Sequence, residues 1–156
     1  MTDANTIRAA TAQDLPAALK LLHDAGLPVA DVSAERLALV AYEQQQMQGV
    51  IGLESFDDLA LLRSLVVCEA TRGSGVGAAL VAALEDACRQ QAVQELWLLT
   101  IDADPFFAKL GYVVRTRDAA PDAIRGTAEF SSLCPGDAVL MSKELRPLPV
   151  PEHLLT

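Results

Sequence analysis

The chain has 156 residues, which suits a single domain that buries about two-thirds of its unfolded surface. Its 21 acidic and 12 basic residues give a formal charge of −9, which disfavours nucleic acid and anionic membranes as partners, because both are bound through clustered lysines and arginines. No uncharged apolar run approaches the roughly 20 residues of a membrane span, and the first residues lack the basic and apolar regions of an export signal, so we expect a cytoplasmic protein.

The beginning of the chain predicts a strand followed by a helix. Residues 6–10 read as a short strand, and residues 15–25 carry leucines and alanines at helical spacing behind capping residues at 11–14. Gly26 ends this helix. Residues 33–35 are compatible with either a brief helix or the approach to a strand.

Three apolar stretches follow that predict strands of an antiparallel meander. They cover residues 36–42, 48–56 and 59–67. The polar residues 43–46 read as a loose hairpin tip, and Asp57-Asp58 reads as the second turn. The third stretch is rich enough in aliphatic residues to be a buried central strand.

A glycine-rich turn follows the third stretch and leads into a long amphipathic helix. Residues 71–77 read Thr-Arg-Gly-Ser-Gly-Val-Gly. Glycines allow positive φ and close approach, so that backbone N–H groups at a helix N-terminus converge on a phosphate, and Arg72 adds a positive charge. The spacing matches neither a dinucleotide fingerprint nor a P-loop. We interpret the turn as an anion-binding loop, the alternative being a tight connection between strand and helix.

The second half of the chain predicts a parallel crossover and further short elements. A strand over residues 93–101 follows the long helix, and strand, helix, strand of this length implies a right-handed parallel connection. The glycine-rich loop then lies at the carboxyl end of a central strand, where open α/β sheets bind ligands. The later elements are a helix over 102–110 ended by Gly111, a strand over 112–114, an irregular polar segment over 115–136 and a strand over 138–141. We expect one domain over 1–146 and a proline-rich tail over 147–156.

The ordered set of strand, Arg-Gly-Ser-Gly-Val-Gly, helix, strand and then Phe-Phe-Ala-Lys-Leu-Gly-Tyr at 106–112 resembles the GNAT superfamily of acetyl-CoA-dependent N-acetyltransferases. The resemblance implies an α/β (α+β) fold with a mixed, mostly antiparallel central sheet, one parallel and splayed strand pair, and helices on both faces. It also implies a homodimer. Four shorter stretches resemble the arsenic-resistance N-acetyltransferase branch, namely residues 25–28, 61–65, 98–100 and 129–135.

The resemblance implies acetyl-CoA as co-substrate. The pyrophosphate would lie on the amides of the glycine-rich loop, and the pantetheine arm would run along the end of the preceding strand, inside a wedge between the two splayed strands. The cofactor-binding residues so implied are Leu65, Val66, Val67, Arg72, Gly73, Ser74, Gly75, Val76, Gly77, Thr100 and Phe107.

Two departures from the family pattern bear on the chemistry. Phe107 stands where many members have a tyrosine that protonates the departing thiolate, and Leu61 stands where the histone-modifying branch has a glutamate. At pH 7, the departure of a thiol with a pKa near 8.5 as a thiolate costs about 2 kcal/mol. Deprotonation costs about 1 kcal/mol for an α-amine with a pKa near 7.8, and nearly 5 kcal/mol for a lysine amine. The absent acid and base therefore favour a small amino-acid-like acceptor, and the resemblance to the arsenic-resistance branch implies a glutamate-analogue antibiotic or an arsenical.

Four polar residues are candidates for the acceptor side. Arg63 on an apolar strand must meet an anion, which is either a substrate or an internal acid. Glu54 orients the amine or activates it through water as a catalytic residue, or it is a solvated strand residue. Glu129 and Ser132 lie in the late polar segment and are expected to close the substrate side.

The sequence therefore predicts an acyltransferase in which a small primary amine attacks the thioester directly, with no covalent enzyme intermediate. The rival interpretation is a non-catalytic acyl-CoA-binding sensor or regulatory module. A serine hydrolase is disfavoured, because the sequence has no Gly-x-Ser-x-Gly elbow and its two histidines are His23 and His153, the latter in the tail. The three cysteines Cys68, Cys88 and Cys134 are widely spaced, so we expect reduced thiols and no metal site.

Overall fold

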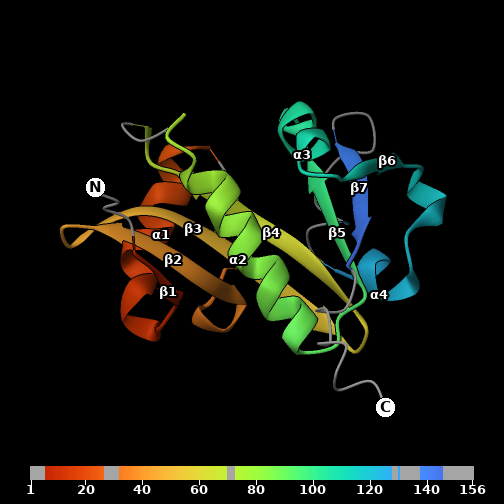
Figure 1. Cartoon of the computed structure of the whole chain (residues 1–156), viewed down its shortest axis with the longest axis horizontal. Coiled ribbons are helices and arrows are strands. Elements are labelled where there is room, and N and C mark those ends of the chain that lie inside the picture. Colours follow the sequence, from red (N-terminus) through yellow and green to blue (C-terminus); the bar gives the residue numbers. More distant parts are fainter. Residues whose placement is uncertain (1–5, 27–31, 70–72, 128–129, 131–137, 146–156) are drawn as a thin grey trace, which may run out of the picture.

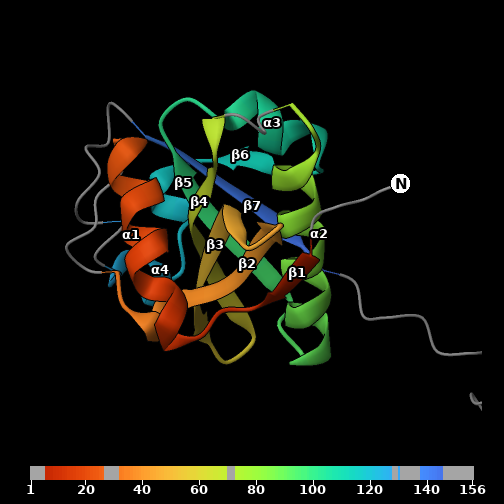
Figure 2. The same cartoon turned by 90° about the vertical axis from the view of Figure 1, so that its left-hand side faces the viewer.

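The computed structural model describes residues 6–26, 32–69, 73–127, 130 and 138–145. Within these ranges the chain forms one seven-stranded sheet in the order β1-β2-β3-β4-β5-β7-β6, with helices on both faces (Figures 1 and 2). Neighbouring strands are antiparallel except for β4 and β5, which are parallel. The expected mixed sheet with one parallel pair is confirmed.

The strands are β1 (Thr6–Ala9), β2 (Leu37–Glu43), β3 (Gln46–Phe56), β4 (Leu59–Val67), β5 (Glu95–Thr100), β6 (Val113–Arg115) and β7 (Val139–Glu144). The α-helices are α1 (Leu15–Asp24), α2 (Val76–Gln90), α3 (Asp104–Lys109) and α4 (Asp122–Arg125), and short 3₁₀ helices cover Ala12–Asp14, Ala34–Arg36 and Arg117–Ala119. None of the helices in the described part of the chain is both long enough and apolar enough to cross a membrane.

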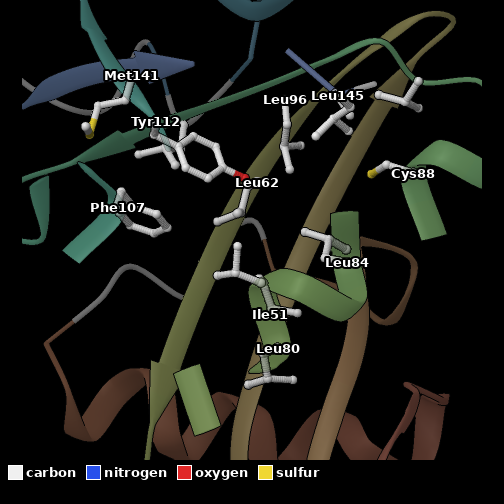
Figure 3. Packing of buried hydrophobic residues seen from close by; sticks show 14 of the residues in the cluster. Ile51, Leu62, Leu80, Leu84, Cys88, Leu96, Phe107, Tyr112, Met141 and Leu145 are labelled. Carbon is white, nitrogen blue, oxygen red and sulfur yellow. The ribbon is translucent and has the colours of Figure 1, made fainter. Parts of the chain in front are cut away.

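The helices cover the two faces of the sheet in separate groups. Figure 2 shows α1 and α2 on opposite sides of the sheet. Because successive strand residues point to opposite faces, Leu62 and Leu96 pack with α2 and with Phe107 of α3 (Figure 3), whereas Val50 packs with α1. A third group on the face opposite α2, named the α4-side cluster, comprises Leu61, Trp97, Leu99, Ala120, Ile124 and Leu140. Burial on both faces explains why β4 and β5 are almost continuously apolar.

The hairpin between β2 and β3 is tighter than the sequence suggests. Glu43 pairs with Gln46, so the tip has two residues rather than the expected loose tip of four. Gln44 has a φ of 51° and Gln45 a φ of 71°. Two successive positive φ values are those of a type I′ turn, whose twist matches the flanking strands. Repeated glutamines carry no local signal for this turn.

The late segment contains more regular structure than expected. Residues 115–136 were predicted to be irregular, but they include the 3₁₀ helix Arg117–Ala119 and α4, which follows the extended Pro121 as its N-cap. Ile124 of α4 is fully buried, and this tertiary contact stabilises a helix that is too short to form alone. The expected tail over 147–156 lies outside the described residues.

A buried carboxylate ties the N-terminal strand to the sheet and to the start of α1. Asp14 is 3% exposed. Its oxygens accept hydrogen bonds from Arg8 Nη1 and Nη2 at 2.9 Å each, from the Thr11 backbone N–H at 2.7 Å and from the Tyr42 hydroxyl at 2.9 Å. The hydrogen bonds from Arg8, above all, lower the pKa of Asp14 below its usual range.

This carboxylate predicts a stability that depends on pH. Because the folded-state pKa of Asp14 is depressed, its contribution is present above the unfolded pKa of about 4 and is lost as the pH falls below that value. We expect Asp14→Asn to lower the free energy of unfolding by about 1–2 kcal/mol at pH 7, and by less at pH 3, in urea titrations. Asp24→Asn, at an exposed carboxylate paired with Lys20, is the control and should change little at either pH; equal losses from both variants would contradict the assignment.

Candidate active site

The parallel strands β4 and β5 separate after three residue pairs. Their pairing runs from Leu59–Glu95 to Leu61–Trp97, whereas β4 continues to Val67 and β5 to Thr100. Figure 1 shows the two strands diverging toward the end where α3 lies. The splayed pair that the resemblance implied is therefore present, and beyond Leu61 β4 no longer pairs with β5.

A β-bulge in β4 lies at the start of the divergent part. Gly52 pairs with Arg63 and Val50 with Val66, so β4 uses one residue more than β3 over this stretch. Ser64 has a φ of 59°, a left-handed conformation that is uncommon outside glycine. A bulge of this kind bends the strand and leaves one residue out of the ladder. No local sequence signal at Ser64 distinguishes it from a regular strand residue.

The glycine-rich turn forms an exposed approach to the N-terminus of α2. Gly73 has a φ of 86° and Gly75, the N-cap of α2, a φ of 93°, and a Cβ at either position would meet nothing within 4 Å. Residues 73–75 are exposed, and the first turn of α2 contains no acidic residue. The N-terminus of α2, which carries the positive end of the helix dipole, therefore begins at an exposed turn, as an anion site requires. Arg72 lies outside the described residues.

Gly77 does not have a positive φ, but it allows neighbouring side chains to approach the backbone closely. A Cβ there would lie 3.4 Å from Phe106 Cζ and 3.5 Å from a Val67 methyl. Phe106 of α3 therefore lies over the first turn of α2, beside the end of β4. Phe107, the expected cofactor contact, is 4% exposed and packs edge-on against Phe106 and Tyr112 in the α2-side core (Figure 3). Phe106 therefore lies at the glycine-rich turn, and the role of Phe107 as a cofactor contact stays a prediction.

Thr100 shapes the turn from β5 into α3. Its Oγ1 accepts a hydrogen bond of 3.0 Å from the backbone N–H of Ala103, directly before α3 begins at Asp104. This hydrogen bond fixes the chain where β5 leaves the sheet and keeps the first turn of α3 beside the divergent strands. The role of Thr100 as a cofactor contact stays a prediction.

A buried charge network holds the wall formed by α3 against α2. Glu85 of α2 accepts a hydrogen bond of 2.8 Å from the Tyr112 hydroxyl, and Lys143 of β7 lies 3.1 Å from both Glu85 oxygens. Burial, then the Glu85 charge, raises the pKa of Tyr112 far above its usual value. Burial likewise raises the pKa of the nearby Cys88 thiol to about 11. The Tyr112 hydroxyl is thus bound to Glu85 in the core and does not take the place of the acid that Phe107 lacks.

Arg63 and Glu54 meet on the face opposite α2. Arg63 is 3% exposed, and its Nη1 lies 2.6 Å from Glu54 Oε2, while Arg36 Nε lies 4.0 Å from Glu54 Oε1. Of the two alternatives for Arg63, the structure contains the internal salt bridge. Glu54 is also the register partner of Leu61, so its side chain projects from the same face at the place where the histone-modifying branch has its glutamate. Arg36 was not nominated from the sequence.

Glu129 and Ser132, expected on the substrate side, lie outside the described residues. Among the residues that are described, no group of three His, Cys, Asp or Glu side chains has the arrangement of a metal site.

The chain is similar to known acetyltransferases. A family model described as "Acetyltransferase (GNAT) domain" matches residues 34–114, which are 81 of the 156 residues. No significant match was found among curated protein sequences.

Three solved structures show the same fold over nearly the whole chain. N-acetylglutamate synthase from Neisseria gonorrhoeae, complexed with coenzyme A and N-acetyl-glutamate, is 20% identical to this chain, with a TM-score of 0.79. The match covers 94% of this chain and 36% of the synthase, so this chain spans about a third of that protein's length. Rv2747 from Mycobacterium tuberculosis, in complex with CoA, is 24% identical with a TM-score of 0.69, and the match covers 90% of this chain and 99% of that one. The ribosomal-protein-S18-alanine N-acetyltransferase from Escherichia coli is 23% identical with a TM-score of 0.69, covering 97% and 99%. At these identities the likeness establishes the fold.

The bulge can be tested through the backbone preference of its central residue. We expect Ser64→Val to lower the free energy of unfolding by about 2 kcal/mol or more in urea titrations, because a β-branched residue is strongly disfavoured at positive φ. Ser55→Val, at an exposed position of regular pairing in β3, is the matched control and should be neutral or slightly stabilising. Equal stability of the two variants would show that Ser64 does not hold the left-handed conformation.

Proposed function

The chain belongs to the GNAT acetyltransferase family, and on that basis we propose that it transfers the acetyl group of acetyl-CoA to the primary amine of a small, amino-acid-like molecule. The observation that carries this proposal is the separation of β4 from β5 after Leu61 and Trp97, next to the glycine-rich turn at the end of β4. Acetyl-CoA needs both features, because its thioester enters between the two strands while its phosphates bind at the glycine-rich turn.

The described residues fit the acetyl donor. We assign the pyrophosphate to the amides of residues 73–77 at the N-terminus of α2, and the pantetheine arm to the end of β4 at Leu65, Val66 and Val67. The exposed glycine positions leave room for a ligand to approach the backbone. Similar folds from Neisseria gonorrhoeae and Mycobacterium tuberculosis were solved with coenzyme A. Arg72, Thr100 and Phe107 complete the proposed donor site.

The proposed acceptor is an amine of low basicity on an amino-acid-like molecule. Deprotonation at pH 7 costs about 1 kcal/mol for an α-amine, against nearly 5 kcal/mol for a lysine amine. An amine that is easily deprotonated asks less of the acid and base groups of the site. The Neisseria gonorrhoeae structure contains N-acetyl-glutamate, and the Escherichia coli enzyme is named for an alanine acceptor. The resemblance to the arsenic-resistance branch extends the proposal to glutamate-analogue antibiotics or arsenicals.

The proposed mechanism is direct attack of the amine on the thioester carbonyl. Glu54 takes the amine proton, through a water molecule, and its carboxylate is held in place by Arg63 and Arg36. Backbone N–H groups near the bulge at Ser64 polarise the carbonyl oxygen. The thiolate leaves without a side-chain acid, which costs about 2 kcal/mol at pH 7. In this proposal Arg63 acts through Glu54, and direct contact of Arg63, Glu129 or Ser132 with the acceptor stays a prediction.

One observation keeps a second candidate function in view. Phe107 has no proton to give, and Tyr112 is committed to Glu85, so the usual acid of the family is missing from the described residues. A non-catalytic acyl-CoA sensor has no need of that acid. Homodimer formation, which the resemblance implies, is compatible with either function.

A thiol-release assay separates the enzyme from the sensor. We expect purified protein to release free CoA thiol from acetyl-CoA when given amino acids or glutamate-like antibiotics, and to release much less with polyamines or lysine-containing peptides, because of amine basicity. Calorimetry with acetyl-CoA alone is run in parallel. Binding of acetyl-CoA with no thiol release across the whole panel would favour the sensor.

The donor site can be tested at a glycine of the turn. Gly75→Asp should weaken acetyl-CoA binding by at least tenfold in calorimetry, because it places a carboxylate and a side chain beside the α2 N-terminus. Gly26→Asp is the matched control, since Gly26 has a φ of 78° and equally open surroundings but lies at the end of α1. The two variants should lose similar stability, and only Gly75→Asp should lose affinity; unchanged affinity in Gly75→Asp would refute the donor site.

A further inference from the structure

Arg117 has a guanidinium nitrogen that no acceptor satisfies. Its Nη2 donates a hydrogen bond of 3.0 Å to the backbone oxygen of Phe130, and its Cζ lies 4.2 Å from the centre of the Phe130 ring. Its Nη1 is shielded from solvent and has no hydrogen-bond partner within the described part of the chain. The side chain is therefore fixed by stacking and by one hydrogen bond, while its other terminal nitrogen is unused.

This unused donor is unusual for this protein. Arg8, Arg63 and Arg89 each donate to a carboxylate, at distances of 2.6–2.9 Å. Arg125 lies near Arg117 in sequence and donates its Nε to the Ala120 oxygen at 3.0 Å and its Nη2 to the Asp118 oxygen at 2.6 Å. A buried charged donor without an acceptor is costly, so an arginine kept in this state is suited to an anion that arrives from outside.

Arg117 lies on the side of the sheet from which an acceptor would approach. Phe130, on which it stacks, packs against the α4-side cluster. That cluster includes Leu61, the last paired residue of β4, and Leu99, two residues beyond the last paired residue of β5. It therefore lies on both strands at the point where they separate, on the face opposite α2. In the proposed function the donor is held at the N-terminus of α2, which packs on the other face, and this leaves the α4 side of the sheet for the acceptor.

A second arginine borders the same cluster. The Arg115 guanidinium lies 5.0 Å from the centre of the Trp97 ring, and its Nη1 donates to Ser142 Oγ at 3.0 Å. Neither Arg115 nor Arg117 forms an ion pair with a carboxylate of the described residues. Glu95 accepts a hydrogen bond of 3.0 Å from Trp97 Nε1 at the Arg115 end of this cluster, so Arg117 is the better placed of the two arginines to meet an anionic acceptor.

We infer that Arg117 binds the carboxylate, or the equivalent oxyanion, of the acetyl acceptor through Nη1. This inference rests on the proposed function and adds to it a specificity-determining residue. Arg117 is only partly buried, so a rotation of the guanidinium on the Phe130 ring brings Nη1 to an entering ligand while the stacking is kept. The planar guanidinium matches a carboxylate, whereas a lysine ammonium binds it as a point charge. The acceptor amine is then directed toward the gap between β4 and β5.

The test compares acids with their amides in thiol-release kinetics. L-Glutamate and L-methionine are each assayed against the corresponding α-amide, with wild type, Arg117→Gln, Arg117→Lys and Arg125→Gln. We expect wild type to prefer the acid by at least tenfold in kcat/KM, and Arg117→Gln to lose that preference through a higher acceptor KM. Its KM for acetyl-CoA and its melting temperature should be unchanged. Arg117→Lys should keep part of the preference, and Arg125→Gln should keep all of it.

The outcomes separate this inference from the proposed function. Thiol release with equal rates for acids and amides, or an acid preference that survives in Arg117→Gln, leaves the acetyltransferase in place and overturns the role of Arg117. An equal loss in Arg125→Gln also overturns it, because the effect is then one of general charge. Absence of thiol release from wild type with every amine overturns both. If Arg117→Gln unfolds, the acid preference of Arg117→Lys decides: a preference equal to that of wild type overturns the role of Arg117, and a partial one supports it.

Discussion

The separation of β4 from β5 is the constraint on which the rest of the structure depends. Three residue pairs hold the strands together at one end, and the left-handed Ser64 bends β4 where it must diverge. Helices α2 and α3 pack along the divergent strands, with Phe106 lying over Gly77. A parallel pair that stayed in register would satisfy more backbone hydrogen bonds, but it would leave no place between the strands for a thioester.

Buried charges fix the two walls of this opening from opposite faces of the sheet. On one face, Glu85 joins α2 to Tyr112 and Lys143. On the other, Glu54 joins β3 to Arg63. Such pairs contribute less to net stability than their geometry suggests, because both ions lose hydration. Each carboxylate does, however, contact side chains from other elements, so these pairs link β3 to β4 and α2 to β7.

The same placement limits the acid–base chemistry. Phe107 and Tyr112, from the motif at residues 106–112, pack against each other in the core. The Tyr112 hydroxyl is hydrogen-bonded to Glu85. The proposed reaction therefore relies on a weakly basic amine, on Glu54 and on a thiol that leaves without a side-chain acid. Substrate chemistry and protein electrostatics are linked here, because each unit of amine pKa adds about 1.4 kcal/mol to the deprotonation that the site must support.

The sequence by itself determined the order of the elements, the crossover from β4 through α2 to β5, and the glycine-rich turn, because strand alternation, helical spacing and positive-φ glycines are local properties of the chain. It also indicated that Arg63 needs an anion. Only the tertiary structure decided that this anion is Glu54, that Ser64 forms a bulge and that Phe106 lies over α2. These features depend on strand register and on which distant segments pack together, and a shift of one residue in register reverses the face of every side chain in a strand. Local sequence does not encode that choice, so the glycine-rich turn before α2 was readable in advance, whereas the contact between Arg63 and Glu54 was not.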